Sequence, residues 1–224
     1  MTTRADLLAQ VRLYLADTDE WPDATLEAYI ADAIRFYSIE FPRAGYRSLS
    51  LTTGTQAYAL WADVREVTKV EYPAGETPAE YLDRVPLNSA ALANGDDVYA
   101  LSAPAYDDYD AQANIVFGPT VATGESAVIH YKGLHAIPTA DTDVLTVPDE
   151  HLEALHAFID FRAHWQLEAG EAVAVTNSSI VLSQLGENAR RAWNRYKEIT
   201  ARLQEQTIVS PAASMGWLGR ERIY

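Results

Sequence analysis

The sequence predicts an α+β fold: a bundle of four helices carries an inserted β-rich lobe of about six short strands and ends in an extended arm. Apolar residues recur at helical spacing in the first 42 residues and again after residue 147. Between these two regions, short runs rich in Tyr, Val and Ile alternate with Gly and Pro turn signals. The 224 residues are 48% hydrophobic and include no cysteine, so the core must form without disulfides.

The first helix pair occupies residues 1–42. A helix is expected from Thr3 to Ala16 and a second from Asp23 to Phe41, with Asp23 as its N-cap and Pro42 as its stop. Because only a short Trp-Pro turn joins them, the two helices should be antiparallel neighbours. Their apolar stripes are Leu7, Leu8, Val11 and Leu15, then Leu26, Tyr29, Ile30, Ala33, Ile34, Tyr37 and Phe41.

Residues 43–146 form the predicted β-rich lobe. The Thr53-Gly54 dipeptide predicts a hairpin between the first two strands, and the short connections favour antiparallel pairing. The segment Pro78–Val85 fits either a strand or a helical turn. The expected strands are Ser48–Leu51, Gln56–Leu60, Val67–Tyr72, Asp97–Ser102, Asn114–Phe117 and Ala127–Leu134.

The second helix pair is expected in residues 147–206. Pro148 suits the first position of the third helix, and Gly170 is a plausible end for it. The last helix should run from Ser178 to Gln206. It has a basic outer face, which in an acidic chain predicts contact with an acidic neighbour, including the next copy of the same protein. These candidate subunit contacts are Arg190, Arg191, Arg195, Lys197 and Arg202.

Residues 207–224 differ from the rest of the chain. Pro211, Gly216 and Gly219 discourage regular structure, yet the segment is too apolar for an ordinary disordered tail. We therefore expect an extended arm that orders on a partner, with Trp217 as its anchor; the alternative is that it folds back on its own domain. The candidate docking residues are Ile208, Val209, Trp217, Leu218, Arg220, Arg222, Ile223 and Tyr224.

The charge balance limits the function. Seventeen Lys and Arg against 32 Asp and Glu give a net charge of −15, which argues against a protein that grips nucleic-acid phosphates. An acidic surface would repel DNA and let it slide past, although solubility alone also explains such a charge. The sequence contains no apolar stretch typical of a membrane span and no secretory signal at its start.

The sequence offers only weak candidates for chemistry. His156, Asp160 and His164 share one helix face and could ligate a metal, but a polar or inter-subunit face is the simpler interpretation. The acidic run 106–110 could bind a hard cation, but it lacks the Gly and Glu of an EF-hand loop. No G-x-S-x-G, P-loop or dinucleotide motif occurs. We therefore expect no catalysis, cofactor or metal, and keep a metal-dependent or carbohydrate-active hydrolase as the alternative.

Two segments carry a resemblance to a known family. DLLAQVRLYLADTDEWPDATLEAYIADAIRFYSIEFP resembles the N-terminal helix pair of the head-to-tail adaptor proteins of tailed bacteriophages, in particular at Trp21-Pro22-Asp23 and the helix that follows. VPDEHLEALHAFIDFRAHW, from Val147 to Trp165, is similar to their third helix. The long β segment departs from the smallest, nearly all-helical members of that family.

The resemblance implies a non-enzymatic virion protein of the head–tail junction, made in the host cytoplasm. It implies a homo-oligomeric ring of about twelve subunits whose helical bundles pack side to side. The C-terminal arm would reach into the portal protein, the β lobe would meet a downstream neck or tail protein, and DNA would pass through the lumen without sequence-specific contact. The alternative within this class is another neck or tail subunit that does not contact the portal.

Overall fold

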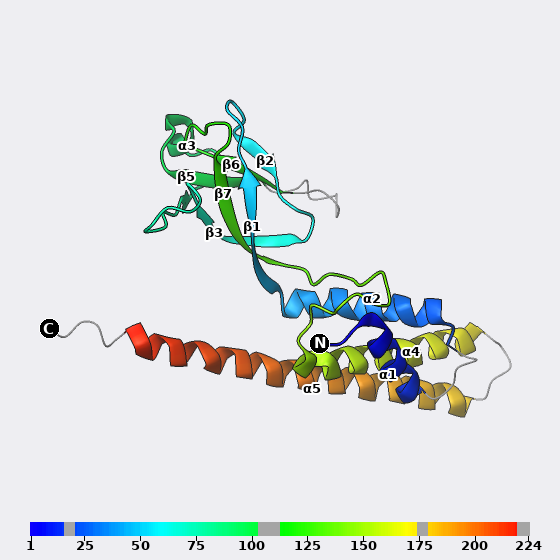
Figure 1. Ribbon diagram of the computed structural model, residues 1–224. Helices are drawn as coiled ribbons and strands as arrows, with labels where there is room; N and C mark the ends of the chain where they lie inside the picture. Colours follow the sequence, from blue (N-terminus) through cyan, green and yellow to red (C-terminus); the bar gives the residue numbers. More distant parts are fainter. Residues whose placement is uncertain (16–20, 103–112, 174–178, 219–224) are drawn as a thin grey trace. The chain divides into compact units, whose positions relative to one another are not determined.

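The computed structural model describes residues 1–15, 21–102, 113–173 and 179–218; residues 168, 170–173, 179–183 and 207–218 are described by their backbone alone. The chain forms two compact units (Figure 1). The helical unit comprises residues 1–41 and 135–224, and the β unit comprises residues 42–134. Each unit has its own apolar core, so the β unit is an insertion within the helical one.

The helical unit is organised around its third long helix. Helix α4 (Leu152–Val173) lies between α2 (Asp23–Glu40) and α5 (Ser179–Leu218), and α1 (Arg4–Leu15) packs against both α2 and α4 (Figure 1). The apolar stripes expected from the sequence form the core, whose most deeply buried members include Leu7, Leu26, Ile34, Tyr37, Leu155, Ile159 and Tyr196. In the described part of the chain, no helix is both long and apolar enough to cross a membrane.

Several helix ends differ from the sequence-based expectation. Pro22 rather than Asp23 is the N-cap of α2, and Asp23 is its first residue. Pro148 precedes a short 3-10 turn, η1 (Asp149–His151), before α4 begins. Gly170 does not end α4, which continues to Val173, because a glycine inside a helix costs only about 1 kcal/mol and no proline follows it there.

The predicted extended arm is wrong for residues 207–218. The backbone stays helical, so α5 is a single helix of 40 residues that ends at Leu218. Pro211 removes one backbone donor, but alanine and methionine, which are strong helix formers, follow it. The remaining docking candidates Arg220, Arg222, Ile223 and Tyr224 lie outside the described residues.

The described part of the β unit contains seven strands in two sheets and one short helix, α3 (Ala90–Asn94). One sheet has the order β1-β7-β3, and the other has the order β2-β6-β5-β4. Pairing is antiparallel except between β4 and β5, which are parallel. Strand β4 lies within Pro78–Val85, the segment for which the sequence allowed either a strand or a helical turn. The strands are β1 (Arg43–Ser50), β2 (Ala57–Ala59), β3 (Val64–Glu71), β4 (Asp83–Arg84), β5 (Val98–Ser102), β6 (Asn114–Phe117) and β7 (Ser126–Gly133).

The predicted hairpin around Gly54 is wrong, although the turn itself is present. Gly54 has a φ of 82°, and the Thr55 N–H donates to the Thr52 carbonyl. However, β1 pairs along its whole length with β7, whereas β2 pairs with β6 in the other sheet. The turn therefore carries the chain from one sheet to the other.

One hydrogen-bonded cluster fixes the place where the chain leaves and re-enters the helical unit. The His135 N–H donates to Ser38 Oγ over 3.0 Å, and Ser38 in turn donates to the Ile34 carbonyl. The His135 ring lies 3.0 Å from the Phe41 carbonyl through Nε2 and 3.1 Å from the Thr146 hydroxyl through Nδ1. These bonds satisfy buried polar groups, so the two crossing points are held together at the end of α2.

Two isoleucines of α2 provide a matched test of this core. Ile34 is fully buried, whereas Ile39 is 70% exposed. Ile34→Ala should lower the unfolding free energy of the helical unit by about 2–5 kcal/mol, since it leaves a cavity. Ile39→Ala should change it by no more than about 0.5 kcal/mol. Urea denaturation followed by the helical circular dichroism signal measures both, and equal losses would contradict the described packing of α2.

Candidate interaction surfaces

The basic residues predicted on the last helix fall into two groups. Arg191 pairs with Glu187 one turn away on α5, over 2.6 Å. Arg195 and Arg202 both reach Glu153 at the start of α4, over 3.1 and 3.0 Å. Arg190 and Lys197 are exposed, and neither makes an ion pair with another described residue. Three of the five arginine and lysine candidates are therefore already paired within the chain.

Glu153 is the electrostatic centre of the α4–α5 contact. The hydrogen bond from Arg195, reinforced by that from Arg202, holds the pKa of Glu153 below its ordinary value against the opposing effect of burial. Its position in the first turn of α4 also favours a carboxylate there, because the helix dipole is positive at that end. These pairs fix the register of α5 against α4.

The two groups of basic residues lie on opposite flanks of α5. Residues Trp193 and Arg195 are two positions apart, which places their side chains about 200° apart around a helix. Arg195 faces Glu153, whereas the Trp193 ring contacts Phe161 at 5.1 Å between centroids. Arg190 and Lys197 are three and four positions from Trp193, so they share its flank.

An aromatic cluster joins α2, α4 and α5 on the Trp193 flank. Phe36 of α2 stacks on Phe158 at 5.0 Å and meets Trp193 and Tyr196 edge-on at 5.8 and 5.9 Å. Trp193 stacks on Tyr196 at 5.4 Å. Such offset and edge-on pairs stabilise beyond simple area burial. The cluster is closed on its inner side by Tyr196, while Phe36 at its outer side is partly exposed.

The histidine and aspartate face of α4 is a polar face. Asp160 and His164 form a pair over 3.3 Å, but His156 instead contacts the Tyr14 ring of α1 at 5.1 Å. Burial, and then the nearby Arg195, lower the pKa of His156, which favours its neutral form. Among the described residues, no three His, Asp or Glu side chains converge as metal ligands.

The structure describes only some of the remaining candidate residues. The acidic run 106–110 lies outside the described residues. The arm candidates Ile208, Val209, Trp217 and Leu218 lie on the described helical backbone of α5, and the structure does not describe their side chains.

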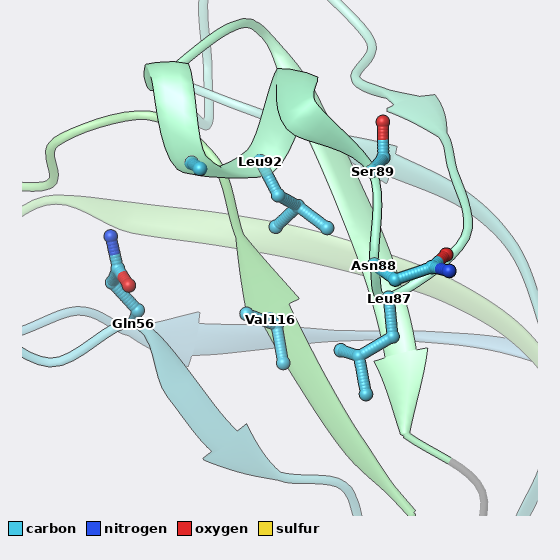
Figure 2. Close-up of a pocket in the computed structure, with 7 residues that line it drawn as sticks. Gln56, Leu87, Asn88, Ser89, Leu92 and Val116 are labelled. Carbon is cyan, nitrogen blue, oxygen red and sulfur yellow. The ribbon is translucent and has the colours of Figure 1, made fainter.

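The β unit has a hollow of about 350 Å³ between α3 and β6 (Figure 2). Leu92 of α3 points toward Val116 of β6, and Gln56, Asn88 and Ser89 lie at the rim. None of its lining side chains titrates, so they supply neither acid–base chemistry nor a charged ligand set.

Three exposed apolar residues of the helical unit were not predicted from the sequence as candidate contacts. Leu13, Ile39 and Trp165 are 82%, 70% and 49% exposed, and each is on the surface of a long helix. A signal was available for the first two, since Leu13 and Ile39 fall outside the 3–4 apolar stripes of their own helices. A large apolar residue outside such a stripe either stays in water or meets a partner.

The chain matches the family described as SU10 adaptor protein over residues 2–211. Since the match covers nearly the whole sequence, the protein belongs to the SU10 adaptor protein family. This confirms the resemblance to phage head-to-tail adaptors and identifies the chain as a structural adaptor protein of a bacteriophage. No curated protein matches the sequence significantly.

The pairing of Glu153 with Arg195 and Arg202 predicts that the free energy of unfolding depends on pH in the acid range. Since the folded state lowers the pKa of Glu153, its ion pairs stabilise the protein above the ordinary glutamate value and are lost as the pH falls below about 4.5. Glu153→Gln should therefore lose less stability than the wild type between about pH 5 and pH 3. At neutral pH it should cost about 1 kcal/mol or less, because the pairs are partly exposed.

Denaturant titrations at a series of pH values test this. Glu187→Gln is the matched control, since it removes a carboxylate that pairs only within α5. If the unfolding free energies of the wild type and Glu153→Gln follow the same pH profile, the ion pairs of Glu153 have no role in stability.

Proposed function

We propose that this protein forms a closed ring between the portal and the neck or tail of the phage particle, with DNA passing through the lumen. The observation that carries the proposal is the family match over residues 2–211. A ring of about twelve copies is the assembly that the resemblance implies. The protein would act by contact alone, without a cofactor and without sequence-specific binding of DNA.

The division into two units supports an adaptor role. A protein that joins two different partners needs two separate binding surfaces on a stable body. The helical unit and the β unit have separate cores, so the surface of one can vary without loss of packing in the other. We propose that the portal binds the C-terminal end of α5 and that the downstream neck or tail protein binds the β unit.

The length of α5 supports a reaching element at the C-terminus. Glu153 lies at the N-terminal end of α4 and pairs with Arg202, so α5 passes this end of α4 close to Arg202 (Figure 1). Residues 207–218 continue beyond it as helix for about 18 Å. A helix is better prepared for docking than an extended arm, because less conformational entropy is lost on binding.

The net charge of −15 supports passage of DNA rather than binding. Tight binding to nucleic-acid phosphates depends on their neutralisation by Lys and Arg, and three of the arginines on α5 are already paired with carboxylates within the chain. An acidic lumen wall would repel the duplex and keep it mobile.

The mass of the assembled protein tests the proposed ring. The chain has a mass of 24.8 kDa, so a ring of twelve would have a mass of about 300 kDa. Light scattering and negative-stain imaging of the protein, alone and with portal rings of its phage, should show either a free ring or a portal with an added collar. A monomer that ignores the portal would exclude this function; binding to a different neck or tail ring would favour the other subunit role.

Truncation of the C-terminal segment tests its role in docking. Ending the chain after Gln206 should abolish docking on the portal and leave the circular dichroism and unfolding transition of the body unchanged, because the last described buried side chain of α5 is Leu203. Trp217→Ala in the full-length chain should weaken docking more than Ser214→Ala in the same segment. Docking that survives the truncation would exclude the arm as the portal contact.

A further inference from the structure

Strand β1 lies at the edge of its sheet. It pairs along its whole length with β7, and the sheet order β1-β7-β3 leaves its other side without a partner strand among the described residues. Just past the strand, the Leu51 N–H donates to the Glu125 carbonyl, so the odd-numbered residues of β1 bond to β7. Because bonding direction alternates along a strand, the main-chain groups of the even-numbered residues face outward. We call these groups the β1 edge; they belong to Ala44, Tyr46, Ser48 and Ser50.

The β1 edge is open to solvent. Its N–H and C=O groups make no hydrogen bond with any other residue that the structure describes. All four of its residues are exposed, and Tyr46 is 73% exposed. A row of unpaired main-chain donors and acceptors is a template on which another strand can form.

The other edges of the two described sheets are protected. Strands β2 and β4 are only three and two residues long. Register shifts interrupt β3, and a following segment covers its outer side: the Tyr72 N–H donates to the Glu80 carbonyl, and the Leu82 N–H donates to the Val70 carbonyl. Short strands, irregular register and a covering segment are the usual means of preventing unwanted strand pairing.

Strand β1 lacks these protections. It is eight residues long, its register with β7 is unbroken, and it contains no proline. Its charged residues are Arg43 and Arg47, and both reach Asp63 at the start of β3, over 3.8 and 2.9 Å. Since β7 lies between β1 and β3, these side chains extend away from the free edge. A long, regular and uncharged edge is typical of a strand that acquires a partner.

The sheet that β1 borders is positively charged within an acidic protein. Strands β1, β3 and β7 carry five Lys and Arg side chains against two Glu, whereas the chain as a whole has a net charge of −15. On the inner face, Asp63 is shared by two arginines, which leaves an excess of positive charge beside the edge. Charge complementarity therefore favours an acidic partner.

The outer face of the sheet offers an aromatic contact at the same edge. The Tyr46 ring lies 6.0 Å from the His130 ring of β7, between centroids. A residue placed opposite Tyr46 on an added strand would share this face. Aromatic and β-branched side chains form the favourable cross-strand pairs with such a residue.

We propose that the β1 edge binds an extended, acidic segment of a partner protein, which adds a strand to the sheet through main-chain hydrogen bonds. The segment has an aromatic or β-branched residue on the side of Tyr46 and carboxylates on the side of Arg43 and Arg47. The inference rests on the proposed function, in which the β unit binds the downstream neck or tail protein, and it names the contact and the chemistry of the bound segment.

Proline substitution at the edge tests strand addition. Ser48→Pro removes an outward N–H but no hydrogen bond to β7, and edge strands tolerate proline at such positions. The probe is the neck and tail complex purified from its phage without this subunit. Ser48→Pro should weaken binding of this complex by about tenfold or more, because it removes one main-chain donor and adds a ring that obstructs the incoming strand. Ser48→Ala keeps the donor and should bind as the wild type does.

Two further measurements make the test independent of this one variant. If the unfolding transition shows that Ser48→Pro disrupts the β unit, Ala44→Pro, close to the start of the strand, takes its place. Hydrogen exchange of the wild type should show the outward amides of β1 exchanging fast in the free protein and slowly once the neck and tail complex is bound. The amides of β2 (Ala57–Ala59) are the control and should keep their exchange rates.

The outcomes separate this inference from the proposed function. All variants should dock on portal rings as the wild type does, because none of them changes α5. If the proline variants bind the neck and tail complex like the wild type, or the outward amides stay unprotected, strand addition is wrong while the adaptor function stands. Protection that appears on ring formation alone, or on addition of single-stranded DNA, would show a different occupant and also overturn the inference. If the wild type binds neither portal rings nor the neck and tail complex, the proposed function is wrong and this inference falls with it.

Discussion

Helix α4 must bury apolar side chains on more than one side, and the helical unit is arranged to satisfy that requirement. Phe158 stacks on Phe36 of α2, Ile159 lies beside Val11 of α1, and Phe161 contacts Trp193 of α5. A helix with apolar groups around so much of its circumference is stable only when other helices surround it. The order of helices in space therefore follows from the sequence of α4, although its neighbours lie more than a hundred residues before it or dozens after it.

The basic residues of α5 fall into two groups with different surroundings. Arg195 and Arg202 face Glu153 and hold α4 and α5 in register, so their charge is neutralised within the chain. Arg190 and Lys197, beside Trp193, make no ion pair with any other residue that the structure describes. The division follows from the 100° step between successive residues, since a helix packed along one stripe leaves two flanks with different surroundings. Composition alone, which counts all five as basic residues, does not distinguish the two roles.

Sequence periodicity predicted α1, α2, α4 and the start of α5 because each has an apolar stripe, but it placed the end of α5 at Gln206 instead of Leu218. The β unit was harder to predict, and β1 shows the reason. Its inward side carries Arg43, Gly45 and Arg47, which no alternation rule identifies as facing inward. Arg47 is accommodated by a two-bond pair with Asp63, both at 2.9 Å, and Gly45 leaves room for the Tyr131 ring. Strand partners also depended on β7, about eighty residues later, which no local turn signal reports. For the candidate surfaces, sequence identified the basic face but not its division, because Glu153 lies 42 residues from Arg195.

The cluster around His135 has a consequence for how such a chain can change over generations. Since the His135 ring touches the Phe41 carbonyl, the 93 residues between them begin and end at nearly the same point of the helical unit. Exchanging that insert for one of another length would alter little in the closure entropy, which grows only with the logarithm of loop length. The helical unit can therefore stay constant while inserts of different length and sequence are exchanged at this one position.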